Sequence, residues 1–467
     1  MENTKTTAQE LKEKLFLQRK NGGLLLSEEE LAAAQAYCED YKLFLDNAKT
    51  EREAVTTAIK MAEANGFVPY EIGKAYAPGD KVYMNNRGKA IIFAVIGTEP
   101  IANGVNLMTS HIDSPRLDLK VNPLYEESEL GYFKTHYYGG IKKYQWVAIP
   151  LSLHGVIILA DGTSVTVSVG EDENDPIFCV TDLLPHLAAD QVKQPLATGI
   201  KGEQLNILIG SLPFRDDEAS EAVKLNLIKY LNEKYGIVER DFRSAELTIV
   251  PAFKAKDIGF DRSLIGAYGH DDRVCAYTSF TALLNAGTPA RTAVCVLADK
   301  EEIGSTGTTG LNAAYLPYFL ENLGAAYGVP GRIIMSNSKC LSADVNAAFD
   351  PNFPEVSEAR NNCFVNYGAV ITKYTGSRGK SGTSDASAEF AAEVQHLLDR
   401  ENVLWQTGEL GKVDQGGGGT VAFCTAELDI DTIDIGVPIL SMHAPMEVAS
   451  KIDIWSTHRA FATFIKG

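Results

Sequence analysis

The chain has 467 residues, 45% hydrophobic and 22% charged, which is the composition of a folded globular protein rather than a disordered or fibrous one. A formal charge of −18, from 61 acidic and 43 basic residues, disfavours nucleic acid and anionic membranes as partners. No apolar run approaches the roughly 20 residues of a membrane span, and residues 1–20 lack the apolar core of a signal peptide, so we expect a cytoplasmic protein.

The first 65 residues are predicted to be helical. Apolar residues recur at spacings of three and four between positions 7 and 65, and Ser27 followed by Glu30 resembles a capping box that opens a helix. Two strand-like runs follow at 81–84 and 90–96. Because the turn sequence Asn-Asn-Arg-Gly joins them, they are predicted to form a hairpin.

The pattern of apolar residues along the sequence changes near residue 115 and again near residue 251. Between these points, closely spaced strand-like runs at 144–151, 156–159 and 164–169 predict an antiparallel β unit. Beyond 251, buried strand-like runs alternate with helical segments, which is typical of a mostly parallel sheet flanked by helices. The runs that carry this pattern are 292–298, 332–335, 364–372, 388–398 and 437–442.

These patterns predict an α/β fold in which both ends of the chain build one domain. Residues 1–114 and 253–467 form this discontinuous domain, and residues 115–252 form a β-rich domain inserted into it. Ligands of open α/β sheets lie beyond the carboxyl ends of the strands, so acids and histidines that follow apolar runs are candidate site residues. The candidates are His111, Asp299, Glu301, Glu302, Asp344 and His443, together with Asp271 at a predicted helix start.

Two imidazoles and several carboxylates suit zinc, cobalt or manganese better than a metal bound by thiolates. One carboxylate shared by two ions, with two further ligands for each, leaves an open position for water, as in a catalytic two-metal site. In the pair Glu301-Glu302, one carboxylate could bind metal while the other acts as general base. Asp113 could accept a hydrogen bond from the second imidazole N–H of His111 and so fix its tautomer.

Each of these features alone has a simpler explanation. A single histidine after a strand is usually a hydrogen-bonded boundary residue, and the pair Glu301-Glu302 could be solvated. Asp271-Asp272 could merely cap a helix. Only their joint occurrence favours a metallohydrolase.

Five ordered segments resemble the aspartyl aminopeptidase family of cytosolic zinc exopeptidases, and the resemblance runs from about residue 54 to the C-terminus. The segments are 110–117 (SHIDSPRL), 271–277 (DDRVCAY), 299–305 (DKEEIGS), 342–347 (SADVNA) and 441–447 (SMHAPME).

The resemblance implies a role for each candidate. His111 and Asp344 would bind one zinc ion, Glu302 and His443 the other, and Asp271 would bridge the two. Glu301 would be the general base, and Asp113 would support His111.

The resemblance also implies that the inserted domain mediates dimerisation and that the subunits build a tetrahedral dodecamer. His186 in the insert would reach a neighbouring subunit's site and help bind the reacting carbonyl. Lys373 would meet the acidic side chain of a substrate with N-terminal Asp or Glu, although residues 375–385 depart from the eukaryotic pattern and are closer to a bacterial branch.

We therefore expect a metal-dependent aminopeptidase that removes single N-terminal residues, with Asp or Glu preferred, from peptides. A dizinc deacylase or amidohydrolase acting on N-acyl amino acids, and a metal-free assembly protein, are the alternatives. The glycine-rich stretches 304–310 and 416–419 match neither a dinucleotide fingerprint nor a P-loop, so they do not indicate nucleotide binding.

Overall fold

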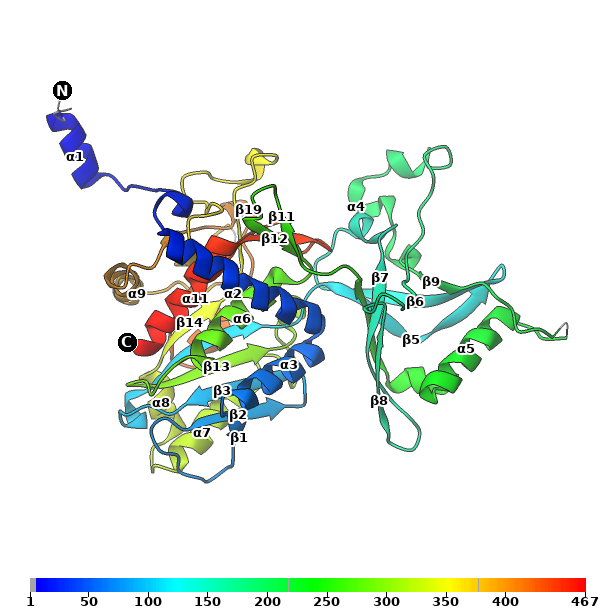
Figure 1. The fold of residues 1–467 in the computed structure, drawn as a ribbon, viewed down its shortest axis with the longest axis horizontal. Coiled ribbons are helices and arrows are strands. Elements are labelled where there is room, and N and C mark those ends of the chain that lie inside the picture. Colours follow the sequence, from blue (N-terminus) through cyan, green and yellow to red (C-terminus); the bar gives the residue numbers. More distant parts are fainter. Residues whose placement is uncertain (1–5, 217, 377) are drawn as a thin grey trace.

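The computed structural model describes residues 6–216, 218–376 and 378–467, and within them the chain folds around two separate large β-sheets (Figure 1). The first sheet has nine strands in the order β1-β2-β3-β13-β4-β14-β20-β16-β17. Its strands are β1 (Val68–Pro69), β2 (Lys81–Asn86), β3 (Ala90–Val95), β13 (Thr292–Ala298), β4 (Val105–His111), β14 (Lys339–Ala343), β20 (Asp431–Gly436), β16 (Ala369–Thr372) and β17 (Trp405–Thr407).

The four central strands of this sheet, β13, β4, β14 and β20, are parallel. In this register Ala298 lies beside His111, so the carboxyl ends of β13 and β4 meet at one edge. β2 and β3 form the predicted hairpin, which extends the sheet with an antiparallel pair. The mostly parallel α/β fold predicted from the sequence is confirmed.

Helices cover both faces of the nine-stranded sheet. Along β3, Ile91 packs in one hydrophobic core and Ile92 in the other, as expected of alternating side chains in a strand buried on both faces. The helices of the first face are α2 (Glu28–Asn47), α3 (Glu51–Ala64), α6 (His270–Leu284), α9 (Ala388–Arg400) and α11 (Lys451–Lys466). Those of the second face include α7 (Tyr315–Ala325), α8 (Gly331–Ser336) and α10 (Ala422–Ala426).

The N-terminal segment is largely helical, as predicted, and α2 begins at the predicted cap. α2 has the capping box formed by Ser27 and Glu30. α1 (Thr7–Leu15) projects away from the body of the molecule and buries no residue (Figure 1). No helix among the described residues is both long enough and apolar enough to cross a lipid bilayer.

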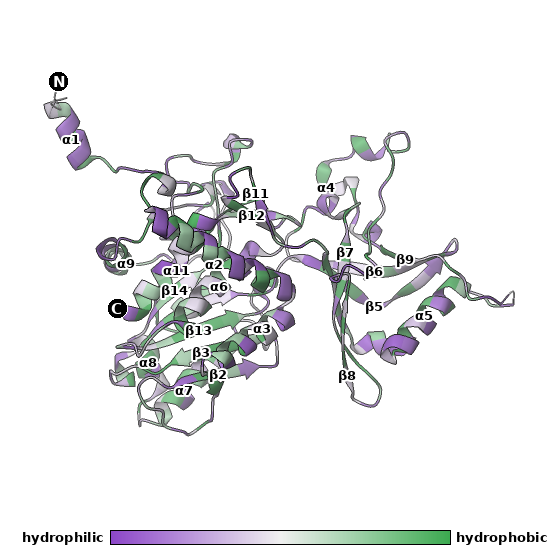
Figure 2. Cartoon of the chain, viewed as in Figure 1, coloured by the Kyte–Doolittle hydropathy of each residue, from purple (hydrophilic) through white to green (hydrophobic). Residues whose placement is uncertain are grey.

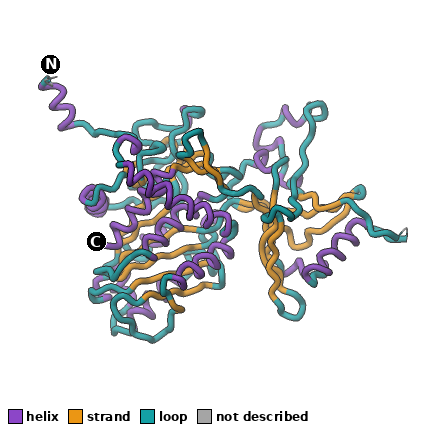
Figure 3. Tube along the Cα trace, in the orientation of Figure 1, coloured by secondary structure: helices purple, strands orange, loops and turns teal. Residues whose placement is uncertain are grey.

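The second large sheet is antiparallel and lies wholly between Arg116 and Pro251. Its order is β8-β7-β10-β5-β6-β9, it has its own hydrophobic core, and α5 (Ala222–Tyr235) packs against it (Figure 3). The strands are β8 (Ser164–Val169), β7 (Leu151–Ile158), β10 (Glu246–Pro251), β5 (Arg116–Glu127), β6 (Leu130–Tyr138) and β9 (Ile207–Gly210), and the short helix α4 (Leu196–Gly199) lies in the same segment. From this separate sheet and core we infer that residues 115–252 form the inserted domain (Figure 2).

Two smaller sheets belong to the discontinuous domain. A five-stranded sheet contains β11 (Lys256–Ile258), β12 (Leu264–Ala267), β22 (Glu447–Ser450), β21 (Pro438–Leu440) and β15 (Asn346–Ala347). A two-stranded hairpin contains β18 (Gly411–Lys412) and β19 (Gln415–Gly416).

Two local predictions are wrong. Residues 332–335 belong to helix α8 rather than to a strand, and Ile334 is buried while Ile333 is 42% exposed. A run of four residues is too short for its periodicity to separate a helix from a strand. Most of 144–151 is also not a strand, because Lys143–Trp146 form a 3₁₀ turn before β7 begins at Leu151.

Candidate active site

The five sequence segments converge at the carboxyl edge of the nine-stranded sheet. His111 is the last residue of β4, Asp344 follows β14, and Asp271 lies in the first turn of α6. Glu301 and Glu302 form a 3₁₀ turn three residues beyond β13. A cavity of about 700 Å³ lies at this edge. The four acids named above and His443 line it, whereas His111 is buried and does not.

Asp271 stands between the two histidines. Its Oδ1 lies 3.1 Å from Nε2 of His111, and its Oδ2 lies 3.2 Å from Nε2 of His443. The side chains of Asp271 and His111 are almost fully buried, whereas His443 is about one-third exposed. Each oxygen of one carboxylate therefore faces a different imidazole, which is the arrangement expected of a bridging ligand.

The remaining acids lie within 4 Å of one histidine or the other. Nε2 of His111 is 3.9 Å from Oδ1 of Asp344 and 3.8 Å from Oε2 of Glu301. Nε2 of His443 is 3.6 Å from Oε1 of Glu302. Ligand atoms of His111, Asp271 and Glu302 all lie within 4.8 Å of one another, and so do those of His111, Asp272 and Asp344.

The cluster fits divalent metal ions. Oδ1 of Asp271 and Oε1 of Glu302 are buried and have no hydrogen-bond partner in the described structure. Among the described residues, no lysine or arginine forms an ion pair with Asp271, Asp272, Glu301, Glu302 or Asp344. Burying several carboxylates without a cation is strongly unfavourable, and nitrogen and oxygen donors of this kind suit zinc. The residues present therefore fit the divalent metals predicted from the sequence.

The electrostatics of the acids follow from burial and mutual repulsion. Burial raises the pKa of Glu302 well above its ordinary value, and the negative charge of Asp271 raises it further. Burial also raises the pKa of Asp344, with a second contribution from Asp272. Burial opposes ionisation of Asp271 too, but the close imidazoles of His111 and His443 outweigh it and lower the pKa of that carboxyl.

Glu301 differs from Glu302 in its surroundings. Burial and the negative charges of Asp271 and Asp113 raise the pKa of Glu301 to about 7, with His111 acting in the opposite sense. Its side chain is 17% exposed and lines the cavity, whereas the side chain of Glu302 is 3% exposed. A partly accessible carboxyl with a pKa near neutrality can accept and return a proton.

Asp113 supports this cluster from behind. Nδ1 of His111 lies 3.0 Å from the backbone carbonyl oxygen of Asp113 and 3.3 Å from its Oδ1. The carboxylate also accepts the backbone N–H groups of Glu301 and Glu302, at 3.1 and 3.2 Å. The side chain of Asp113 is fully buried, so its position is fixed by these contacts.

The two predicted substrate-binding residues lie outside the cavity lining. Nζ of Lys373 binds Oδ1 of Asp385 at 2.7 Å, and both side chains are nearly half exposed. Lys380 binds the other oxygen of Asp385, and Lys380 itself lines the cavity with Arg378 and Lys412. His186 lies on an exposed segment of the inserted domain, and no described side chain hydrogen-bonds to its imidazole.

Sequence reasoning missed several residues that contact the cluster, among them Glu447 and Gly140. The buried carboxylate of Glu447 accepts the backbone N–H of Asp271 at 2.9 Å and that of His443 at 2.7 Å. The backbone carbonyl oxygen of Gly140 lies 2.8 Å from Nδ1 of His443. Glu447 stands in the segment 441–447, which was its only signal, and the sequence around Gly140 has none.

Comparisons with known proteins agree with this geometry. The family described as "Aminopeptidase I zinc metalloprotease (M18)" matches residues 44–465. A protein of Clostridium acetobutylicum named "Probable M18 family aminopeptidase 1" is 50% identical over 459 residues, which cover 97% of this chain and 99% of that protein. The crystal structure of an M18 aminopeptidase from Thermotoga maritima has 44% identity and a TM-score of 0.92, covering 96% of this chain and 99% of the other.

A more distant structure shares the fold. The dodecamer of mApe1 from yeast is 20% identical, with a TM-score of 0.76, and the match covers 94% of this chain and 97% of that one.

Proposed function

This chain belongs to the M18 family of aminopeptidase I zinc metalloproteases, and on that premise we propose that it is a two-zinc aminopeptidase with Glu301 as general base. His111 and Asp344 would hold one ion, His443 and Glu302 the other, and Asp271 would bridge them. The observation that carries this assignment is the position of Asp271, whose two oxygens lie 3.1 and 3.2 Å from two different imidazoles.

When bound, the zinc ions would polarise the scissile carbonyl and lower the pKa of water at the site toward neutrality. Glu301 would take a proton from the attacking water and deliver it to the departing amine. Its place at the cavity wall, 3.8 Å from Nε2 of His111, supports this role. The carboxylate of Asp113 would hold Glu301 in place by accepting the backbone N–H of Glu301. The contact of Asp113 with Nδ1 of His111 would leave Nε2 of that ring free for metal.

We further propose that the enzyme prefers N-terminal Asp or Glu. Three cationic residues, Arg378, Lys380 and Lys412, line the cavity and could attract an acidic side chain. Lys373 would contribute through Asp385, because this carboxylate binds both Lys373 and the cavity-lining Lys380.

We propose that subunits assemble as dimers and as a dodecamer, with His186 acting in a neighbouring subunit's site. The segment around His186 is apolar yet exposed: Leu183, Leu184 and Leu187 are 51%, 50% and 68% exposed. Such a surface is typical of protein interfaces.

A cytoplasmic location is supported by the seven cysteines, all of which are free thiols.

The test combines metal analysis with a substrate panel. Protein purified without chelator is expected to hold close to two zinc, cobalt or manganese ions per chain by elemental analysis. It should hydrolyse aminoacyl anilides, fastest with Asp or Glu, and lose activity on dialysis against a chelator. Hydrolysis of N-acyl amino acids alone would instead identify a deacylase, and a metal-free protein that hydrolyses neither substrate class would refute the proposed function.

A further inference from the structure

The end of strand β6 in the inserted domain contacts both halves of the proposed metal centre. β6 ends at Tyr138, which is followed by Gly139 and Gly140. These three residues come from the domain that the sequence associates with assembly and, through His186, with a neighbouring subunit's site. Their contacts indicate a further task for that domain, at the site of its own chain.

The hydroxyl of Tyr138 donates a hydrogen bond to Oδ2 of Asp113 at 2.8 Å. Asp113 in turn contacts Nδ1 of His111 and the backbone N–H groups of Glu301 and Glu302. The tyrosine is 9% exposed and the aspartate is fully buried, so water does not replace this contact easily. Asp113 alone therefore links Tyr138 to His111, a proposed metal ligand, and to Glu301, the proposed general base.

Gly140 acts on the other half of the centre. Its carbonyl oxygen lies 2.8 Å from Nδ1 of His443, and because a carbonyl can only accept, this nitrogen carries the proton. Nε2 of His443 is then free to face Oδ2 of Asp271 and Oε1 of Glu302. Gly139 approaches Glu302 closely: a Cβ at this glycine would lie 3.0 Å from Oε2 of Glu302.

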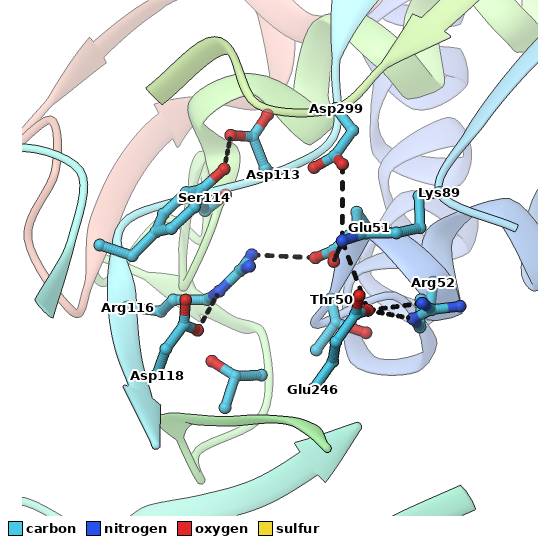
Figure 4. A network of polar contacts seen from close by, with 12 residues as sticks. Thr50, Glu51, Arg52, Lys89, Asp113, Ser114, Arg116, Asp118, Glu246 and Asp299 are labelled. Atoms are coloured by element: carbon cyan, nitrogen blue, oxygen red, sulfur yellow. Dashed lines mark hydrogen bonds and ion pairs between the residues drawn. The ribbon is translucent and has the colours of Figure 1, made fainter. Parts of the chain in front are cut away.

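A buried charge network fixes β6 relative to the discontinuous domain (Figure 4). The guanidinium of Arg116 lies 4.1 Å from the ring centroid of Tyr138 and donates to Oε2 of Glu51, at the start of α3, at 2.9 Å. Lys89 lies 3.4 Å from Glu51 and 3.7 Å from Asp299, two residues before Glu301. The network therefore crosses the junction between the two domains. It also reaches Asp299 at the end of β13, close to the proposed general base Glu301.

We propose that Tyr138 is a positioning residue for peptide hydrolysis, and that the segment 138–140 aligns both metal-binding histidines through the inserted domain. Tyr138 would act on His111 and Glu301 through Asp113, and Gly140 would act on His443. Removal of such outer contacts to metal ligands typically weakens metal affinity or activity ten- to a hundredfold. The inference rests on the proposed two-metal function.

The test uses Tyr138→Phe, which keeps the ring against Arg116 and removes only the hydroxyl. Metal-free protein is titrated with Co²⁺, and the cobalt absorption spectrum, the apparent affinity, kcat and KM are measured. The matched control is Tyr137→Phe, since Tyr137 is the preceding residue, is 42% exposed, and no described residue hydrogen-bonds to its hydroxyl. Thermal melting of the metal-free proteins reports whether each variant is folded.

A second variant, Gly140→Ala, probes the other half independently. The added Cβ would lie 3.3 Å from Nδ1 and 3.6 Å from Cε1 of His443, so the ring must shift. Gly287→Ala is the control, because a Cβ there meets no atom within 4 Å. Gly140→Ala keeps the inference open to refutation if Tyr138→Phe fails to fold.

Both test variants are expected to change the cobalt spectrum, to weaken Co²⁺ binding about tenfold or more, and to lower kcat with little change in KM. Folded variants with the wild-type cobalt spectrum and affinity would overturn the inference while leaving the proposed function intact. A wild-type protein that binds no Co²⁺ would overturn both. Controls that behave like the test variants would also overturn it, because the effect would then not depend on contacts with the site.

Discussion

The backbone N–H of Asp271 donates to Oε2 of Glu447 at 2.9 Å, although 176 positions separate the two residues. Oε1 of the same carboxylate accepts the backbone N–H of His443 at 2.7 Å. One buried acid thus fixes the backbone of the proposed bridging ligand and of a terminal ligand. The peptide N–H groups of Asp271 and His443 would be left without an acceptor in the protein interior if this carboxylate were lost.

Glu447→Gln is therefore expected to destabilise the protein. The amide NH₂ would face one of the two N–H donors, and an unsatisfied buried donor costs about 1–3 kcal/mol. The free energy of unfolding, measured in urea for metal-free protein, should fall by this amount, and metal retention should fall with it. Glu427→Gln, at an exposed position, is the control. Wild-type stability and metal content in Glu447→Gln would show that the lost hydrogen bond contributes nothing.

Glu301→Gln and Glu302→Gln are expected to separate catalysis from metal binding. Loss of a general base lowers the rate by about 10²–10⁴-fold, so Glu301→Gln should retain metal and lose most of kcat. Glu302→Gln should instead lose one ion per chain, because its buried Oε1 faces Nε2 of His443 at 3.6 Å. Elemental analysis and steady-state kinetics of the two variants measure these outcomes. Near wild-type turnover in Glu301→Gln would remove Glu301 from the mechanism.

The sequence predicts most of the site because ligands of an open α/β sheet follow its strands. His111 ends a buried strand and Asp271 lies at a helix start, so their residue types and places are both visible in the sequence, whereas Asp344 follows β14 and not the strand predicted at 332–335. Which acid pairs with which histidine is not visible there. That pairing depends on side-chain directions at the sheet edge, such as the two orientations at Glu301 and Glu302.

The supporting contacts could not be predicted in the same way. Tyr138 and Gly140 belong to another domain, and Gly140 acts through its backbone carbonyl, which every residue has. The strand predicted at 332–335 fails for a local reason, since a four-residue run with three apolar side chains fits a helix turn as well as a strand. The proposed metal ligands are therefore easier to predict from the sequence than the residues that would orient them.

The junction between the domains is expected to respond to pH through His154 and Glu171. Nδ1 of His154 lies 2.7 Å from Glu53 of α3, and its Nε2 lies 3.1 Å from Glu171, which also binds Lys49 at 2.8 Å. Burial lowers the pKa of His154, but hydrogen bonds with Glu171 and Glu53 outweigh it, so the net pKa is raised. Burial raises the pKa of Glu171, but His154 and Lys49 outweigh it and lower the pKa to about 2.

The two shifts act at opposite ends of the pH scale. The stabilisation from His154 is complete below its unfolded pKa of about 6.5 and is lost as the pH rises through its raised folded value. The stabilisation from Glu171 is complete above an unfolded pKa of 4.5 and is lost as the pH falls toward 2. Glu171→Gln should flatten both slopes in urea unfolding between pH 3 and 8, whereas the exposed Glu173→Gln should not. Unchanged slopes in Glu171→Gln would assign the pH dependence elsewhere.

Lys380→Met is expected to reduce the proposed acidic preference. Nζ of Lys380 lies 3.6 Å from the ring centroid of Tyr374 at the cavity wall, where it could meet a substrate carboxylate. Loss of one such charge contact should cost about 1 kcal/mol, or roughly fivefold in kcat/KM for Glu-anilide, with little effect on Leu-anilide. Lys373→Met should give a smaller change because it acts through Asp385. Lys229→Met, on an exposed face of α5, is the control.

A larger effect in Lys373→Met than in Lys380→Met would reverse this order and place Lys373 itself at the substrate. Equal loss for both anilides in both variants would show that neither lysine sets the preference.

The exposed leucines beside His186 predict a link between assembly and activity. Leu187→Glu would place a charge on a surface that is apolar and 68% exposed in the single chain, so burying it against a second copy would be strongly unfavourable. Light scattering should show smaller particles, and activity should fall with them. His186→Ala should keep the assembly but lower kcat, whereas Ile72→Glu, at a 76% exposed position of the discontinuous domain, should do neither. Fully active Leu187→Glu monomers would show that each site is complete within its own chain.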